Sequence, residues 1–206
     1  MSAEKIEKKP RGRPSSFNRV EILEVVMNLF WDHGYNKLSF NEIAVETGLT
    51  RASLYNAFET KEALFLEALQ HYFKSSVDKN LRDLKPGELV GPALYETLKN
   101  AAQIYVTDKQ KRGCMGVNCF NELIGKDTHL SVPIGKIYEE YKKSLKSLIR
   151  QAIEQNELPC HTDAEITANM VLVFMNGFSI FTKSKTTKKT LDKMALDFLQ
   201  KLGFKI

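Results

Sequence analysis

The residue types best suited to specific hydrogen bonding gather in one short segment, TRASLYNAF, at residues 50–58. If a helix begins after Thr50, Leu54 and Phe58 share one face, as residues that contact a core do. The opposite face and the first turn carry Arg51, Ala52, Ser53, Tyr55 and Asn56. A tyrosine, an amide and a guanidinium beside small neighbours can reach a partner, so this surface is predicted to bind through hydrogen bonds.

The amino-terminal tail carries most of the net positive charge. Residues 1–19 contain six Lys or Arg and two Glu, which is 6 minus 2 or +4, and the 206-residue chain has a net charge of +5. Gly12 lets the backbone approach a groove floor, and Pro14 keeps the chain extended. Arg11 and Arg13 suit the negative potential of an A·T-rich minor groove. The tail therefore favours a polyanionic partner; charge alone is equally consistent with a solvated terminus.

Three closely spaced helix starts position the hydrogen-bonding segment. The predicted N-caps are Asn18 for a helix over residues 19–33, Ser39 for residues 40–47 and Thr50 for the segment itself. Ser39 and Glu42 have the spacing of a capping box, and Gly48 can take the left-handed conformation that ends a helix. Only about two residues separate the second helix from the third, so the two must cross steeply, and Ala44 is small enough to let them approach. A fourth helix is predicted to begin after Thr60.

These motifs carry a family resemblance. From GRP in the tail through LFWDHGYNKLSFNEIAVETGLTRASLYNAFETKEALFLEAL, the chain resembles the DNA-binding domain of the TetR family of bacterial transcriptional repressors. Ala44, Gly48, Leu49 and Leu54 stand where a helix-turn-helix requires small, turning and core residues. The remainder, with KRGCMGVN at residues 111–118, is similar to the ligand domains of a subgroup that includes repressors sensing electrophiles or copper.

The resemblance implies how the chain would meet DNA. The third helix would lie in the major groove and present its first residues to base edges, with Ala52 as a contact to a thymine methyl. Tyr55 and Lys61 would bind phosphate, as would the helix starts at Ser39 and Thr50. The predicted DNA-binding residues are Arg11, Arg13, Ser39, Thr50, Arg51, Ala52, Ser53, Tyr55, Asn56 and Lys61. For Tyr55, packing beside the first helix as a half-buried aromatic is the alternative.

The rest of the chain is also predicted to be helical. Apolar periodicity indicates further helices over residues 93–107, 115–124, 133–156, 163–182 and 191–202, with a break at Gly91-Pro92 among others. The predicted fold class is therefore all-α, with about nine helices and no sheet. The predicted domains are a flexible basic arm over residues 1–16, a helix-turn-helix DNA-binding domain over 17–60, and a helical effector-binding and dimerisation domain over 61–206.

The last two predicted helices are unusually apolar for the surface of a monomer. Their candidate interface residues are Ile166, Met170, Val173, Phe174, Gly177, Phe178, Phe181, Leu191, Met194 and Phe198. An ordinary core would explain the same periodicity. The family resemblance favours a homodimer in which this helix pair packs against its two-fold mate as a four-helix bundle. Four lysines between the two helices, Lys183, Lys185, Lys188 and Lys189, are predicted to lie in a solvated connecting loop.

The carboxy-terminal part is expected to enclose an effector cavity with a few polar groups. Candidate lining residues are Tyr105, Cys114, Asn118, Cys119, Tyr138, Tyr141, Met170 and Phe174, although each residue type is common in ordinary cores. Lys109, Lys111 and Arg112 precede Cys114, and nearby cations favour a reactive thiolate. The alternative is an inert buried cysteine beside a noncovalent ligand pocket. The histidines show no metal-ligand spacing, so no metal and no cofactor are expected.

Composition and motifs narrow the function. The tail is charged where a signal peptide is apolar, Glu165, Asn169 and Asn176 interrupt the most apolar segment, and three cysteines suit a reducing compartment, so a cytoplasmic protein without membrane contact is expected. No catalytic constellation is apparent, which disfavours an enzyme. The leading hypothesis is a homodimeric transcriptional regulator that binds double-stranded palindromic operator DNA and is released by a small-molecule or electrophilic effector. The alternative is an architectural protein that binds A·T-rich DNA through the basic arm.

Overall fold

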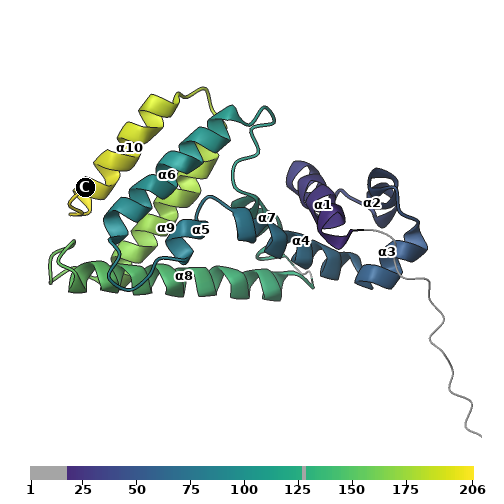
Figure 1. Ribbon diagram of the computed structural model, residues 1–206, viewed down its shortest axis with the longest axis horizontal. Helices are drawn as coiled ribbons and strands as arrows, with labels where there is room; N and C mark the ends of the chain where they lie inside the picture. Colours follow the sequence, from purple (N-terminus) through teal and green to yellow (C-terminus); the bar gives the residue numbers. More distant parts are fainter. Residues whose placement is uncertain (1–17, 127–128) are drawn as a thin grey trace, which may run out of the picture.

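The computed structural model describes residues 18–126 and 129–206, which form ten helices and no strand. The amino-terminal helices gather at one end of an elongated molecule, and the longer helices form a bundle at the other end (Figure 1). The first group comprises α1 (Arg19–His33), α2 (Phe40–Thr47), α3 (Arg51–Phe58) and α4 (Lys61–Ser75). The predicted all-α class is confirmed.

Local capping explains why the first helices begin and end where they do. The Ser39 hydroxyl accepts from the Glu42 N–H at 3.2 Å, and the Glu42 carboxylate accepts from the Ser39 N–H at 2.7 Å, which completes the predicted capping box. Gly48 ends α2 with a φ of +67° in the left-handed region, where a side chain would be strained. Thr50 then caps α3 by accepting from the Ser53 N–H at 3.1 Å. The tight turn between α2 and α3 therefore follows directly from sequence.

The remaining six helices correct the prediction in three places. They are α5 (Lys79–Arg82), α6 (Val90–Thr107), α7 (Met115–Leu123), α8 (Ser131–Glu154), α9 (Ala164–Phe181) and α10 (Lys188–Lys201). The single turn of α5 was not predicted, so the described residues contain ten helices rather than nine. Gly91-Pro92 is no break, because proline is tolerated in the first turn, where its missing N–H would have no intrahelical partner. Lys188 and Lys189 belong to α10 rather than to the connecting loop.

A distant carboxylate supplies the missing cap of α6. Leu89 at the N-cap has no capping side chain, and the buried Glu157 accepts from the N–H groups of Val90 and Gly91, both at 2.8 Å. A β-carbon on Gly91 would lie 2.9 Å from the Phe204 ring and 3.2 Å from Glu157. Glycine at this position therefore permits Glu157, which follows α8, and Phe204, which follows α10, to approach the start of α6.

The apolar residues form two cores that meet near α7. The first core contains residues of α1 to α4 together with Met115, Cys119 and Leu123 of α7. The second is built from α6, α8, α9 and α10. Cys114, which directly precedes α7, packs against both cores. The helix α7 thus shares the first core with the amino-terminal helices and also contacts α8. The boundary predicted at residues 60 and 61 stays a prediction.

The helix α9 is long and apolar enough to cross a membrane by length and composition, with a mean hydropathy of 1.4. Polar residues within it do not lower the mean as far as the sequence interpretation assumed. A core helix of a soluble protein passes the same test, and α9 packs against both α8 and α6 (Figure 1). Its buried residues, among them Val171, Leu172 and Phe178, are part of the second core.

Candidate DNA interface and effector cavity

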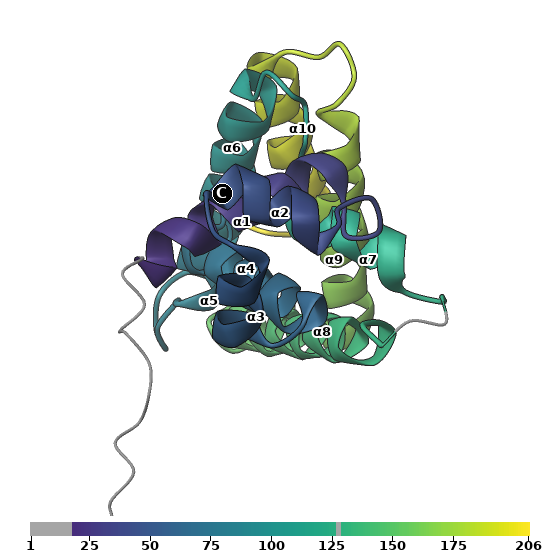
Figure 2. The same ribbon diagram turned by 90° about the vertical axis from the view of Figure 1, so that its right-hand side faces the viewer.

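The helix α3 presents the predicted polar surface. Leu54 and Phe58 are buried in the first core, whereas Arg51, Ala52, Tyr55 and Asn56 are exposed. Seen from the amino-terminal end of the molecule, α1, α2 and α3 lie in front of the bundle (Figure 2). The Ser53 hydroxyl lies 2.9 Å from the Thr50 hydroxyl, so both belong to the cap that begins the helix. The exposed face can therefore enter a groove without displacing core residues.

Tyr55 packs on α2, not beside the first helix. Its ring centroid lies 4.5 Å from that of Phe40, the first residue of α2, and 47% of the residue stays exposed. This contact fixes the ring against the helix that precedes the turn. The hydroxyl end is then held at the surface, where a phosphate oxygen could accept from it.

Lys61 begins α4 and lies over an aromatic ring. Its Nζ is 4.0 Å from the ring centroid of Tyr35, whose hydroxyl donates to the Glu62 carboxylate at 2.7 Å. Partial burial lowers the pKa of Lys61, while burial and the Glu62 contact raise the pKa of Tyr35 and keep its hydroxyl protonated. Lys61, the predicted phosphate contact, therefore packs against Tyr35 in the turn between α1 and α2.

Sequence reasoning missed Arg19, which ties three helices together. Its guanidinium donates to the Glu67 carboxylate at 2.7 and 2.9 Å, donates to the Ala57 carbonyl at 3.1 Å, and lies 4.2 Å above the Phe58 ring. Glu67 is 48 residues away, so no local pattern signals the pair. The contact holds the end of α3 against α1 and α4. Arg11 and Arg13 lie outside the described residues.

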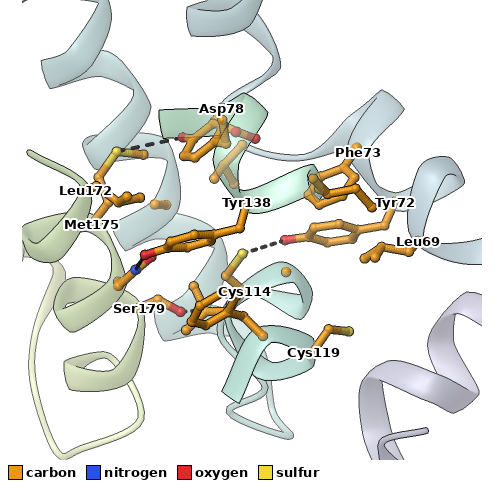
Figure 3. Close-up of a pocket in the computed structure, with 18 of the residues that line it drawn as sticks. Leu69, Tyr72, Phe73, Asp78, Cys114, Cys119, Tyr138, Leu172, Met175 and Ser179 are labelled. Carbon is orange, nitrogen blue, oxygen red and sulfur yellow. Dashed lines mark hydrogen bonds between the residues drawn. The ribbon is translucent and has the colours of Figure 1, made fainter. Parts of the chain in front are cut away.

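A cavity of about 570 Å³ lies between α4, α6, α7, α8 and α9. Figure 3 shows side chains from several of these helices converging on it. Five of the eight predicted effector residues line it, namely Tyr105, Cys114, Cys119, Tyr138 and Tyr141. Most of the remaining wall is apolar and includes Leu69, Phe73, Leu98, Ile137 and Leu172. The volume is suitable for a small organic molecule.

Three predicted effector residues do not line this cavity. The Asn118 amide nitrogen donates to the Arg112 carbonyl at 2.9 Å, and its oxygen accepts from the Lys183 Nζ at 2.9 Å. Met170 is 47% exposed on the outside of α9, and Phe174 stacks on Phe198 of α10 with ring centroids 3.8 Å apart. The physical reason is helical phase, because α9 turns Leu172, Met175 and Ser179 toward the cavity instead.

The cavity contains phenol hydroxyls whose partners are sulfur atoms. Tyr72 donates to the Cys114 Sγ at 3.4 Å (Figure 3), and Tyr141 donates to the Met175 Sδ at 3.9 Å. Burial raises the pKa of Tyr72, Tyr105 and Tyr141, so these groups remain protonated donors. Sulfur is a weak acceptor, and an oxygen atom of a bound molecule would be a stronger partner.

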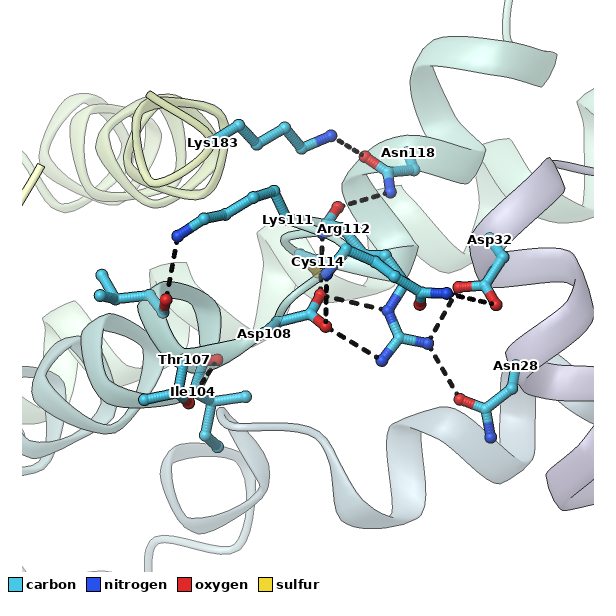
Figure 4. Close-up of polar contacts among 12 residues, drawn as sticks. Asn28, Asp32, Ile104, Thr107, Asp108, Lys111, Arg112, Cys114, Asn118 and Lys183 are labelled. Carbon is cyan, nitrogen blue, oxygen red and sulfur yellow. Dashed lines mark hydrogen bonds and ion pairs between the residues drawn. The ribbon is translucent and has the colours of Figure 1, made fainter. Parts of the chain in front are cut away.

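Cys114 is placed by a contact from α9, not by the cations that precede it. Its backbone N–H donates to the Ser179 hydroxyl at 2.8 Å. Figure 4 shows that Arg112 is engaged with Asp108 and with α1, while the Lys111 Nζ donates to the Val106 carbonyl at 2.9 Å. The prediction that cations surround the Cys114 thiol is therefore wrong, and the Tyr72 hydroxyl contacts it instead. Burial raises the pKa of Cys119, which keeps that thiol protonated and unreactive.

The predicted dimer residues divide between surface and core. Ile166, Met170, Val173, Gly177 and Phe181 are exposed on one side of α9, and Phe174, Met194 and Phe198 are partly buried. Phe178 and Leu191 are buried within the protomer, at 3% and 0% exposure, because they face the second core. The prediction that these two residues form part of the dimer interface is therefore wrong.

A metal site is not evident among residues 18–126 and 129–206. No group of three or more His, Cys, Asp or Glu side chains there could hold an ion. Cys160 is exposed after α8, away from the cavity-lining Cys114 and Cys119. The family resemblance allowed copper sensing, but this part of the chain holds no set of side chains that could bind copper.

Known proteins share this architecture. Residues 22–68 match the family described as bacterial regulatory proteins, tetR family, and residues 92–196 match the one described as tetracyclin repressor-like, C-terminal domain. The HTH-type transcriptional repressor ComR of Escherichia coli (strain K12) is 27% identical over 189 residues, covering 91% of this chain and 90% of ComR. The HTH-type transcriptional repressor BdcR of Escherichia coli (strain K12) is 32% identical over 104 residues, covering 50% of this chain and 53% of BdcR.

A solved structure is similar over nearly the whole chain. It is a cysteine mutant of the TetR family transcriptional regulator CifR complexed with a 26-base-pair double-strand operator DNA. It is 27% identical, with a TM-score of 0.78, and the likeness covers 91% of this chain and 98% of that chain. An exposed recognition helix joined to a helical domain with an apolar cavity defines a DNA-binding transcriptional regulator. The chain belongs to the tetR family of bacterial regulatory proteins.

Proposed function

We propose that this protein is a homodimeric transcriptional repressor that binds a palindromic operator and leaves it when an effector occupies the cavity. The observation that carries the proposal is the helix-turn-helix of α2 and α3, whose exposed face bears Arg51, Tyr55 and Asn56. The likeness to CifR, whose mutant was solved on operator DNA, supports it. The protein acts in the cytoplasm, where its DNA is, and by binding rather than by catalysis.

The mechanism is a shift between conformations of the dimer. Two recognition helices read successive half-sites when they lie about 34 to 36 Å apart, one turn of B-DNA. An effector that binds better to a dimer with a different spacing shifts the population toward that dimer. The operator is released because the two helices no longer fit their half-sites together.

The decisive experiment identifies the operator first. DNA fragments from the source genome are passed over the protein, and the retained fragments are sequenced. A repressor enriches a short palindrome and binds it at least about 1,000-fold more tightly than random DNA of the same length. An architectural protein acting through the basic arm enriches A·T-rich DNA without a palindrome and shows a much smaller ratio, a result that would overturn the proposal.

Cys114 supports a covalent version of the same response. The thiol lines the cavity, and the Tyr72 hydroxyl can donate to the thiolate that reacts with an electrophile. With N-ethylmaleimide, the sulfur adds to one alkene carbon and a proton adds to the other, which places a bulky group at the start of α7. Cys114 is the N-cap of α7, and positions five residues apart on a helix lie about 140° apart around its axis, so a disulfide to Cys119 would need local unwinding. The alternative is reversible binding of a noncovalent ligand beside an inert thiol.

The covalent version is tested by releasing operator DNA with N-ethylmaleimide. Cys160 is exposed and would react as well, so Cys160→Ser serves as the parent protein. Release from the parent but not from Cys114→Ser in that background supports modification at Cys114. Equal release from both proteins, or from neither, would leave reversible ligand binding as the mode of response.

A further inference from the structure

We propose that Arg112 and Glu122 are positioning residues that hold α7 and the residues directly before it against the DNA-binding helices. We further infer that the cavity controls DNA binding through these two contacts, which we call clamps. The inference deepens the proposed function and rests on it, because the cavity must hold the effector. Each clamp joins the segment of residues 112–122 to a different part of α1 or the turn after it.

The Glu122 clamp holds the turn between α1 and α2. One carboxylate oxygen accepts from the Tyr35 N–H at 3.0 Å, and the other accepts from the Asn36 N–H and from its side-chain amide, both at 2.8 Å. Gly34 has a φ of +79°, and a β-carbon there would lie only 2.7 Å from the Glu122 Oε2. Glycine therefore gives the turn both its conformation and the room for the carboxylate. Charge-assisted hydrogen bonds of this kind are the strong ones.

The Arg112 clamp holds α1 itself. The Nη1 atom donates to the Asn28 Oδ1 at 3.0 Å and to the Asp32 Oδ1 at 3.1 Å (Figure 4). The guanidinium also lies 4.2 Å from the Trp31 ring centroid. On its own side of the contact, its Nε donates to the Asp108 Oδ2 at 3.1 Å. These side chains are about one-fifth exposed, so the charges are less screened than a surface ion pair.

Between the clamps, the chain forms part of the cavity wall. The lining residues of this segment are Cys114, Gly116, Val117, Cys119, Phe120 and Asn121. The segment lies close to α4, because a β-carbon on Gly116 would lie 3.3 Å from the Phe73 ring. A molecule that displaces the wall would move α7 relative to α4. The displacement reaches α1 and the following turn through Arg112 and Glu122.

The Glu122 clamp leads directly to a predicted DNA contact. Tyr35, whose N–H Glu122 holds, has its ring under the Lys61 ammonium at 4.0 Å and its hydroxyl on Glu62. The turn therefore connects the cavity wall to the start of α4, just after α3. The same turn leads into α2 at Ser39. A small shift of the turn would change how α2 and α3 sit on the duplex.

The test uses the reciprocity of coupled sites. If the cavity wall affects operator binding, operator binding must affect the wall, whatever the natural effector is. The probe is the rate at which iodoacetamide alkylates Cys114, followed by mass spectrometry in a Cys160→Ser parent. Fragmentation of the peptide that contains both cysteines distinguishes Cys114 from the buried Cys119. Operator DNA is added well above each variant's own dissociation constant, so that occupancy is equal. Alkylation proceeds from those conformations of the wall in which the thiol is accessible, so its rate follows their population. In the parent, the operator is expected to shift that population, and with it the rate, about tenfold.

The clamp variants should lose that response. Arg112→Met and Glu122→Gln are expected to reduce the operator-induced change to less than about twofold. Asp32→Asn weakens the Arg112 clamp from the α1 side with a smaller change, in case Arg112→Met does not fold. The matched controls are Lys142→Met and Glu139→Gln, which break an exposed ion pair on α8 and should keep the full response.

The outcomes separate this proposal from the proposed function. A parent that binds no specific operator overturns the proposed function itself. A parent that binds its operator tightly without any change in the Cys114 rate overturns the coupling. Clamp variants that bind operator and keep the tenfold response overturn the assignment to Arg112 and Glu122. Loss of the response in the clamp variants alone supports it.

Discussion

Replacing Val173 by glutamate should dissociate the dimer without unfolding the protomer. Val173 is 71% exposed on the outer face of α9, so no protomer core depends on it. Glutamate also has a better helix propensity than valine, which leaves the helix intact. Phe178, which the sequence analysis also assigned to the dimer interface, is not a suitable site for this test. It is 3% exposed, and its replacement would disrupt the second core.

The size of the effect follows from that exposure. Full burial of a valine side chain stabilises by at least about 1.5 kcal/mol, so covering the exposed 71% contributes about 1 kcal/mol in each protomer. Two-fold symmetry doubles this to about 2 kcal/mol, and two poorly paired carboxylates in the seam add about 2 kcal/mol or more. The total, on the order of 4 kcal/mol, corresponds to a dimer about 1,000-fold weaker.

Sedimentation over a wide concentration range measures the dimer dissociation constant directly. Val132→Glu is the matched control, since Val132 is similarly exposed at 66% but lies in the first turn of α8. The control should remain dimeric, and circular dichroism should show equal helix content in both variants. A Val173→Glu protein whose dissociation constant stays within about threefold of the wild-type value, against the expected 1,000-fold, would refute this interface.

Three further predictions concern separate parts of the molecule. Arg51→Ala and Asn56→Ala should reduce discrimination between operator and random DNA by about 1 to 3 kcal/mol each, whereas Lys61→Ala should weaken binding to all sequences and flatten its salt dependence. Titrations on both DNAs at several salt concentrations check this. Occupying the cavity by alkylating Cys114 with N-ethylmaleimide should raise the thermal midpoint of the wild-type protein but not of Cys114→Ser, as calorimetry would show. Glu157→Gln removes the negative charge that caps the start of α6. It should lower the free energy of unfolding of the protomer by about 1.5 to 3 kcal/mol, measured by urea unfolding.

The amino-terminal helices could be predicted to the residue because their signals are local. Asn18, Ser39 and Thr50 cap within three residues of their partners, and Gly48 ends α2 by its own conformational freedom. The exposed surface of α3 follows from the same short-range pattern. Nothing beyond the segment itself was needed to predict it.

The contacts that position the site could not be predicted in this way. Glu122 is 87 residues from Tyr35, and Glu157 is 67 residues from Val90, so neither pair leaves a periodic or capping signal. Each carboxylate accepts from two backbone N–H groups in a segment far from it in the sequence. A sequence that lacks a capping residue before α6 indicates only that some distant acceptor is required.

Helical phase explains the mixed result for α9. Periodicity identifies which residues share a face, but residues of this helix meet three different environments. Val171 packs in the protomer core, Met175 and Phe178 line the cavity, and Val173 is exposed. The assignment of Met170 and Phe174 to the cavity failed because their apolar character suits all three environments equally.

The spacing of the exposed residues of α9 decides between lipid and a second helix as their cover. Ile166, Met170, Val173 and Gly177 follow one another at intervals of four, three and four residues. This is the heptad spacing of a seam between two helices, whereas a helix surrounded by lipid would be apolar over its whole outer surface. A β-carbon on Gly177 would meet nothing within 4 Å, so the middle of the stripe leaves room for another backbone to approach closely. Protein therefore covers this face better than lipid does, and the two-fold copy of the same stripe is the complementary partner.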